Sequence, residues 1–312
     1  MAKGFFSQTI IVLFTQVPAL DELKSQLDGF TVLHDVETGK QNPHVGERGL
    51  TILFQPEYNG QVLLDIIPFP WPDEMGHPEH DPVLFAAWGD GQYGPFTYPH
   101  NLARAIQQAW RWPEAPSEAQ KHQACVRLRL SYALGKQLPA ETTIDPLMEL
   151  SFLTELAMAV SQHPAAQAIF NPAGETLLPL LEMAESLRYH HEHEIPPLEL
   201  WSNVRFFNVD DTWMLMDSVG NAQLDIADVE VAFPNGHFNP ADIDTFIRNI
   251  SFYLLKHGSI IQPGDTMDDA NGNTWEAQPF PESLSAPPRP IIRWFPHGQH
   301  PDRPRLLLPS QD

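Results

Sequence analysis

The sequence predicts an α+β protein with mixed, mostly antiparallel sheets and helices packed on their faces. Three observations indicate this class. Several short segments alternate apolar and polar residues, as strands with one buried face do. Asn-Gly turns join some of these segments as hairpins, and amphipathic helical patterns separate others. Because the order strand, helix, strand, strand, helix, strand can be traced in each half of the chain, we expect two fused ferredoxin-like modules.

Length and composition predict how the chain divides. A chain of 312 residues is about twice as long as a common single domain. Its 42% hydrophobic and 10% aromatic residues suffice for a sizeable core and exclude global disorder. We predict an N-terminal α+β half over residues 1–115, a C-terminal α+β half over residues 116–296, and a mobile tail over residues 297–312.

The first half opens with a strand pattern that contains the apolar run from Ile10 to Phe14. A short amphipathic helix follows, with Pro18 at its start and Gly29 as its stop. Two apolar runs between Leu50 and Ile67 flank Asn59-Gly60, a dipeptide that allows positive φ at both turn positions. These patterns predict a strand, a helix and a hairpin.

Between Pro68 and Pro99 the sequence is rich in proline, glycine and aromatic residues. Proline removes amide donors and favours extended backbone, so we expect one long ordered loop here rather than a helix. Long loops inside compact proteins are often functional. The aromatic side chains are expected to pin this loop to the body or, alternatively, to line a recess; they are Trp71, Phe85, Trp88, Tyr93, Phe96 and Tyr98.

The second half contains clear strand and helix patterns. In the segment ACVRLRLSY, apolar residues alternate with Arg127 and Arg129, which predicts a half-buried strand. We expect these arginines to meet carboxylates, with an anion site as the alternative. Asp145-Pro146 and Asn239-Pro240 each open a helix, because the first side chain accepts from free amides and proline needs no partner there.

The stretch from Trp201 to Phe233 contains the densest structural pattern in the chain. It combines two aromatic-rich strand patterns, an Asp-Asp turn and a Val-Gly-Asn turn. Three acidic residues close it among apolar neighbours: Asp225, Asp228 and Glu230.

Charge and cysteine content limit the classes of partner. Forty acidic and 18 basic side chains give a formal charge of −22, which repels nucleic acid and anionic membranes. This charge favours solubility and a basic protein partner. The single cysteine, Cys125, excludes an intrachain disulfide and is expected to be buried and inert. Because polar residues interrupt the apolar run near the N-terminus, we expect a first strand rather than an export signal, and a cytoplasmic location.

Seven motifs occur in order along the chain: WGDGQYGPFTYPHNLARA, VRLRLSYALG, LWSNVRFF, MDSVGNAQLDIADVEVAF, FIRNISFYLLKHG, GDTMDD and PPRPIIRW. Together they resemble the bacterial family catalogued as domain of unknown function 4261, from about Tyr93 to Trp294. The resemblance implies a bacterial cytoplasmic α+β protein and no particular reaction, cofactor or catalytic residue. The shared motifs contain Asp217, Gly220, Asn221, Asp228, Gly264 and Asp265.

Two histidine-rich clusters are candidate metal sites. Residues 190–194 contain three histidines and two glutamates, and His77, Glu79 and His80 form a second group. On a helix His190 and Glu194 would share a face whereas His191 and His193 would not, and no HExxH or Cys-x-x-Cys spacing is present. We therefore predict solvated side chains, no bound metal and no cofactor. A calcium loop near Asn271-Gly272 is rejected because Met267 and Gln278 would occupy two ligand positions.

The sequence lacks a Gly-x-Ser-x-Gly elbow, a phosphate-binding glycine loop and a dinucleotide fingerprint. We therefore expect a non-catalytic protein-binding role, most concretely an immunity or adaptor protein that binds a basic toxin or secreted effector. The alternative is a metal-assisted hydrolase that uses Asp217, Asp228 and Asp265, with His237 as proton carrier; turns and helix caps are the simpler role for these carboxylates. The expected partner-binding residues are Asp73, Glu74, Glu79, Asp81, Trp88 and Tyr93.

Overall fold

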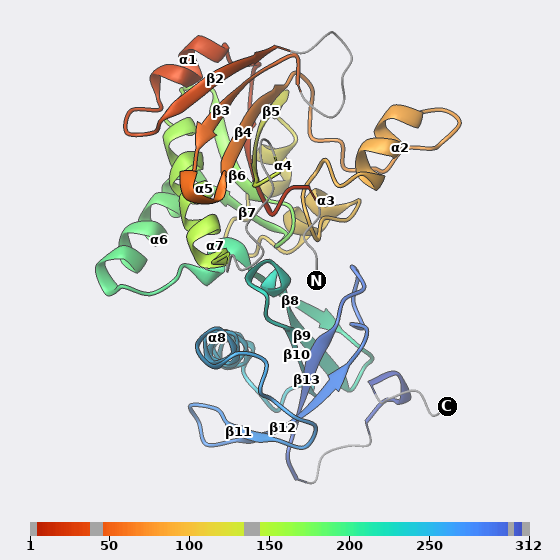
Figure 1. Ribbon diagram of the computed structural model, residues 1–312. Helices are drawn as coiled ribbons and strands as arrows, with labels where there is room; N and C mark the ends of the chain where they lie inside the picture. Colours follow the sequence, from red (N-terminus) through yellow and green to blue (C-terminus); the bar gives the residue numbers. More distant parts are fainter. Residues whose placement is uncertain (1–4, 38–45, 134–143, 299–302, 308–312) are drawn as a thin grey trace. The chain divides into compact units, whose positions relative to one another are not determined.

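The computed structural model describes residues 5–37, 46–133, 144–298 and 303–307. The chain folds into two compact units, Met1–Trp201 and Ser202–Asp312. The described residues form eight α-helices and two mostly antiparallel sheets, and 31% of these residues are helical and 28% are in strands. The predicted α+β class is confirmed (Figure 1).

The first unit is built on a seven-stranded antiparallel sheet with the order β2-β3-β4-β5-β1-β6-β7. The predicted hairpin around Asn59 is confirmed as β3 and β4. Its turn differs from the predicted one, because Asn59 but not Gly60 has a positive φ and the 3-10 turn Pro56–Tyr58 lengthens the connection. The strands are β1 (Gln8–Phe14), β2 (Val32–Glu37), β3 (Arg48–Leu53), β4 (Gln61–Ile67), β5 (Ala124–Ser131), β6 (Ala166–Asn171) and β7 (Thr176–Pro179).

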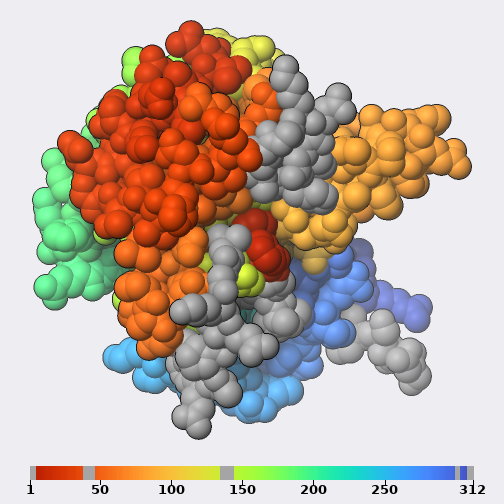
Figure 2. All heavy atoms as spheres, turned by 45° about the horizontal axis from the view of Figure 1, so that its top comes forward, coloured from red at the N-terminus to blue at the C-terminus, as the bar shows by residue number. Residues whose placement is uncertain are grey.

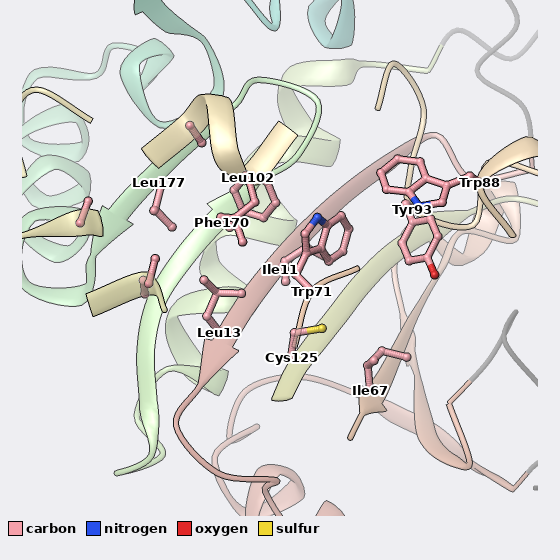
Figure 3. Close-up of a cluster of buried hydrophobic side chains, with 14 of the residues drawn as sticks. Ile11, Leu13, Ile67, Trp71, Trp88, Tyr93, Leu102, Cys125, Phe170 and Leu177 are labelled. Carbon is pink, nitrogen blue, oxygen red and sulfur yellow. The ribbon is translucent and has the colours of Figure 1, made fainter. Parts of the chain in front are cut away.

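Helices cover both faces of this sheet. On one face α5 packs against β1 and β5, and the Asp145 carboxylate caps this helix by accepting from Leu147 N, as predicted. On the other face the shorter helices enclose a core that includes Trp71 and Phe170 (Figure 3). The helices of this unit are α1 (Leu20–Ser25), α2 (Pro82–Gly89), α3 (Asn101–Gln107), α4 (Ala115–Ala119), α5 (Pro146–Val160), α6 (Leu180–His193) and α7 (Leu198–Trp201).

Two local predictions for this unit need correction. Strand β5 is buried along its whole length rather than on one face, because helices cover both faces of the sheet. The predicted loop from Pro68 to Pro99 contains α2, because the run from Val83 to Trp88 has no proline or glycine and Pro82 occupies the first helical turn. Helix α2 stands away from the sheet of its unit in Figure 1, and the light orange atoms at the right of Figure 2 form a lobe.

The second unit is a six-stranded sheet with the order β11-β12-β13-β10-β9-β8. Strands β10 and β13 are parallel, and the other neighbours are antiparallel. Helix α8 (Pro240–His257) packs on β9 and β10, and the Asn239 side chain caps it by accepting from Ala241 N. The strands are β8 (Asn203–Asn208), β9 (Trp213–Val219), β10 (Asp228–Pro234), β11 (Thr266–Asp268), β12 (Thr274–Phe280) and β13 (Ile291–Pro296).

The ferredoxin-like modules are not confirmed. The second sheet follows three strands, one helix and three strands, so the predicted order with two helices does not occur there. The division after Trp201 also differs from the predicted boundary between residues 115 and 116, because β5 pairs with β1 and β4 in one sheet. Part of the predicted tail, residues 299–302 and 308–312, lies outside the described residues, whereas Leu307 is buried in the core of the second unit.

None of the helices in the described part of the chain is both long and apolar enough to cross a membrane.

A buried ionic cluster joins β4 and β5 in the first unit. Arg127 donates from Nη2 to Asp65 Oδ2 at 2.6 Å, and Arg129 Nη2 lies 3.2 Å from the same oxygen. All three side chains are fully buried. The backbone amide of Gly46 also donates to Asp65 Oδ2, and a Cβ at that position would lie 2.2 Å from Ile66 O. The expectation that these arginines meet a carboxylate is therefore confirmed.

The protonation of this cluster follows from burial and charge. Burial favours the neutral form of Asp65, but attraction to Arg127 and Arg129 outweighs it and lowers the pKa of Asp65. Burial, together with repulsion from Arg127, lowers the pKa of Arg129 to about 9. Burial also raises the pKa of the Cys125 thiol to about 12, which makes it a poor nucleophile, as expected from the sequence.

Replacing Asp65 by Asn should destabilise the first unit by about 3–5 kcal/mol at neutral pH, because two buried guanidinium groups lose their carboxylate. The pKa of Asp65 is lower in the folded chain than in the unfolded chain. The Asp65 carboxylate therefore makes its full contribution to the free energy of unfolding above the unfolded-state pKa, and this contribution is lost as pH falls through the folded-state pKa. Urea denaturation should show the difference from wild type shrinking as pH falls below the usual pKa of an aspartate. Asp28→Asn, at an exposed site, is the control, and a pH-independent difference would contradict the prediction.

Candidate functional site

The register of the second sheet aligns four charged residues in one row. Arg205 on β8 is opposite Asp217 on β9, Asp217 is opposite Glu230 on β10, and Glu230 is opposite Arg293 on β13. Side chains that are opposite one another on neighbouring strands share a face of the sheet. The row therefore places two carboxylates between two guanidinium groups, and Asp228, two residues before Glu230, lies on the same face.

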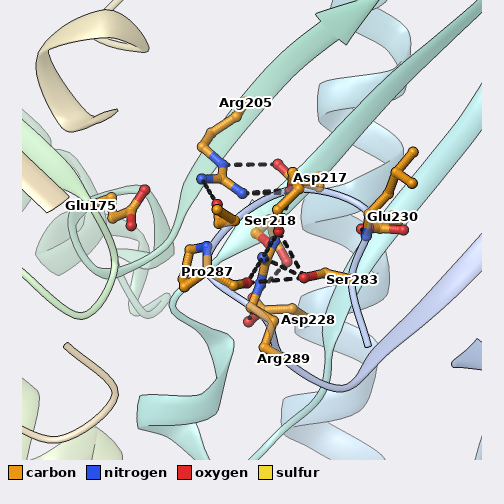
Figure 4. Close-up of polar contacts among 12 residues, drawn as sticks. Glu175, Arg205, Asp217, Ser218, Asp228, Glu230, Ser283, Pro287 and Arg289 are labelled. Carbon is orange, nitrogen blue, oxygen red and sulfur yellow. Dashed lines mark hydrogen bonds and ion pairs between the residues drawn. The ribbon is translucent and has the colours of Figure 1, made fainter. Parts of the chain in front are cut away.

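Asp217 is the centre of this network (Figure 4). Arg205 binds it in a bidentate manner, with Nε 3.0 Å from Oδ1 and Nη2 2.7 Å from Oδ2. Arg289, from the segment before β13, donates from Nη2 to Oδ2 at 2.6 Å. Ser285 also donates to Oδ2. Both oxygens of this fully buried carboxylate are thus occupied by donors of the protein.

Asp228 and Glu230 are bound in the same way. Asp228 Oδ1 accepts from Ser218 Oγ at 2.9 Å and from Asn221 N at 3.0 Å, while Arg289 Nε lies 3.2 Å from Oδ2. Arg289 therefore contacts both predicted aspartates. Glu230 forms a separate buried pair, accepting from Arg293 Nε at 2.7 Å and from Leu284 N at 2.9 Å.

Burial and ion pairing act against each other in this network. Burial raises the pKa of Asp217, but the neighbouring Arg205 and Arg289 outweigh it and hold that pKa below the usual aspartate value. For Asp228 and Glu230 burial is the stronger effect, so the pKa of each is raised despite Arg289 and Arg293.

This geometry suits a structural core better than a cation site. A divalent cation needs free carboxylate oxygens, whereas those of Asp217 and Asp228 accept from guanidinium, hydroxyl and amide groups. A bound cation would also lie beside two arginines, Arg205 and Arg289, and would be repelled by both. The network balances the charges of its carboxylates and fixes β8, β9, β10 and the segment before β13 to one another.

The other two residues of the hydrolase hypothesis lie outside this network. Asp265 is exposed and accepts from Gln262 N at 2.7 Å in a turn before β11. His237 is also exposed, and its Nδ1 lies 3.1 Å from Asn235 O. The structure therefore brings Asp217 and Asp228 together through Arg289 but does not add the predicted third carboxylate or proton carrier.

The expected partner-binding residues divide into exposed and buried groups. Glu74, Glu79 and Asp81 are exposed on the segment around α2. The carboxylate of Asp73, in contrast, accepts from Leu102 N at 2.7 Å and from Ala103 N at 2.9 Å, so it caps the first turn of α3.

Trp88 and Tyr93 do not lie on the surface, which corrects their proposed role in contacting a partner. They are only 8% and 5% exposed and belong to the core below α2 (Figure 3). Their ring centroids are 4.5 Å apart, and both rings also pack against Trp71. Trp88 Nε1 donates to Glu74 O at 3.0 Å. These aromatic residues hold the segment to the sheet, as one of our two sequence interpretations expected.

The histidine-rich end of α6 borders a pocket of about 410 Å³ between α5 and the segment that follows α6. Helical spacing suggested that His190 could pair with Glu194, but it does not. Its Nε2 instead lies 3.1 Å from Glu199 Oε2, and its Nδ1 lies 2.8 Å from Ser186 O. Glu194 ends the helix in a left-handed conformation. Within the described residues, no three potential metal ligands gather at this pocket.

Comparison with known protein families matches the part of the chain that contains most of the ionic network. Residues 217–295 match the model of the family described as "Domain of unknown function (DUF4261)". The resemblance predicted from the sequence is thereby confirmed for this segment, which is shorter than the predicted span from Tyr93 to Trp294. The DUF4261 segment contains Asp217, Asp228, Glu230 and two of their arginine partners. Searches of curated proteins and of solved structures give no match to the chain.

Sequence reasoning identified the carboxylates of this network but missed their cationic partners. Arg205 lies among apolar residues in NVRFFN, and Arg289 and Arg293 follow one another at a spacing of four in RPIIR. These arginines sit on strand patterns rich in apolar residues. A positive charge on a buried strand needs a nearby carboxylate. This requirement could have indicated from the sequence that the arginines pair with the buried carboxylates.

The substitution Asp217→Asn should destabilise the second unit by about 3–5 kcal/mol, because it leaves Arg205 and Arg289 buried without their shared carboxylate. Asp265→Asn is the matched control. Asp265 lies in the same DUF4261 segment but is exposed. This variant should therefore change the free energy of unfolding of the second unit by no more than about 0.5 kcal/mol. Urea denaturation followed by tryptophan fluorescence measures both, and equal effects would contradict the structural assignment of Asp217.

Proposed function

We propose that the protein has a non-catalytic, protein-binding role and that it binds a basic partner through the segment around α2. This segment, residues 69–91, is called the α2 arm below. An immunity or adaptor protein paired with a basic toxin or secreted effector is the most concrete form of this role. The supporting observation is the charge of the arm and its exposure.

The α2 arm is negatively charged throughout. It contains no lysine or arginine, and neither does any position between Arg48 and Arg104. Glu74, Glu79 and Asp81 are exposed, and so is Asp90 just after α2, whereas only Asp73 is held by backbone amides. A surface with charges of a single sign accelerates association with an oppositely charged partner and slows association with a similarly charged one.

The arm also presents apolar surface beside these charges. Val83 is 54% exposed and Phe69 is 50% exposed. Interfaces commonly combine a few apolar contacts with a charged rim. The base of the arm is anchored by Trp71, Trp88 and Tyr93, so binding would cost little ordering of the backbone.

Neutralising Glu74, Glu79 and Asp81 together, as E74Q/E79Q/D81N, should slow association with the partner by at least about tenfold at low salt. Wild-type protein is immobilised at low salt in chelating buffer and exposed to a lysate of the producing cells. The basic proteins that it retains are identified by mass spectrometry. The rates at which they associate with the wild type and with the variant are then measured. The rate constant of wild type should fall as salt is raised, and that of the triple variant should depend on salt much less.

The control variant D28N/E57Q/E114Q removes three exposed charges of the same unit away from the arm. It has the same net charge as the arm variant, so a difference between the two variants reports the location of the charges. Binding through the α2 arm would be refuted if the two variants associate with the partner at equal rates. It would also be refuted if none of the retained proteins associates at different rates with the two variants.

A further inference from the structure

We propose that His77, Glu79 and His80 form a surface site for a divalent zinc ion. Each side chain offers one ligand atom, and these atoms all lie within 4.8 Å of one another. Among the residues that the structure describes, no other three histidine, cysteine or carboxylate side chains gather so closely. Sequence spacing alone favoured solvated side chains here, because it did not show how this segment turns.

The backbone of the segment explains why the two histidine side chains converge. His77 O accepts from His80 N at 3.1 Å and from Asp81 N at 2.8 Å, which closes a single helical turn. Residues three apart on such a turn lie on the same side, and the ring centroids of His77 and His80 are 5.0 Å apart. Pro78 restricts the backbone between them.

The chemistry of the three groups suits zinc. Imidazole nitrogen and carboxylate oxygen are both common zinc ligands, and a site with two histidines and one glutamate leaves a coordination position for water. Zinc–nitrogen bonds of about 2.0–2.1 Å place tetrahedral ligands about 3.3 Å apart. All three side chains are exposed, so small rotamer changes can close the remaining distance without disturbing a packed core.

One existing hydrogen bond competes with the metal. His77 Nδ1 accepts from Glu79 N at 3.2 Å. Binding zinc would release this amide, but the residue is exposed and water can replace the bond at low cost. The exposed carboxylates of Glu74 and Asp81, and the absence of lysine and arginine along the arm, favour a divalent cation electrostatically.

The test uses the full chain without a histidine tag, stripped with chelator and titrated with zinc chloride by calorimetry. Wild type should bind one zinc ion in a step that H77A/H80A loses or weakens by at least about tenfold. The control variant H191A/H193A removes two exposed histidines from α6 and should bind zinc like wild type. E79Q should weaken binding less than the double histidine variant, because both imidazoles remain.

A second probe reports coordination directly. Cobalt chloride should give visible absorption bands typical of low-coordinate cobalt with wild type and with H191A/H193A, and these bands should be absent with H77A/H80A. The proposal is overturned if wild type binds no zinc, or if H77A/H80A binds zinc as tightly as wild type. Since partner association is measured in chelating buffer, the zinc site and the partner-binding role can fail independently.

Discussion

The cost of placing charge in an apolar interior constrains both units. A buried carboxylate is tolerated only where a cation and hydrogen-bond donors compensate for lost hydration. In the first unit Asp65 is matched by Arg127 and Arg129 across β4 and β5. In the second unit the strand register brings Arg205, Asp217, Glu230 and Arg293 into one row. Strand alignment and charge balance therefore depend on each other, because a shift by one residue would move each charge to the opposite face.

The same constraint separates structural charges from available ones. The buried carboxylates of Asp217, Asp228 and Glu230 are bound by arginines, which leaves them unsuited to act as metal ligands or to move protons. The exposed carboxylates of the α2 arm, Glu74, Glu79, Asp81 and Asp90, have no basic side chain within the same segment. Burial thus makes the first group part of the core, and exposure leaves the second group accessible from solvent.

Much of the fold could be predicted because it depends on local signals. The Asn59 turn, the Asp145 and Asn239 caps and the apolar periodicity specify their elements within a few residues. Contacts between distant residues could not be predicted in this way. Arg289 lies 72 residues from Asp217, and no local pattern indicates that they pair. Helix α2 was missed because surrounding prolines and glycines dominated the composition, and Trp88 and Tyr93 were placed outside because burial depends on what covers them.

The position of β13 affects the order in which the second unit can assemble. It is the last strand of its sheet in sequence, yet it lies in the interior between β10 and β12. During synthesis from the N-terminus, β8, β9 and β10 can pair early, but β10 keeps an open edge until residues 291–296 have left the ribosome. Until then Glu230 lacks Arg293 and Asp217 lacks Arg289. The nascent chain therefore carries uncompensated carboxylates on an unfinished sheet, which delays the cooperative folding of this unit until β13 has been synthesised.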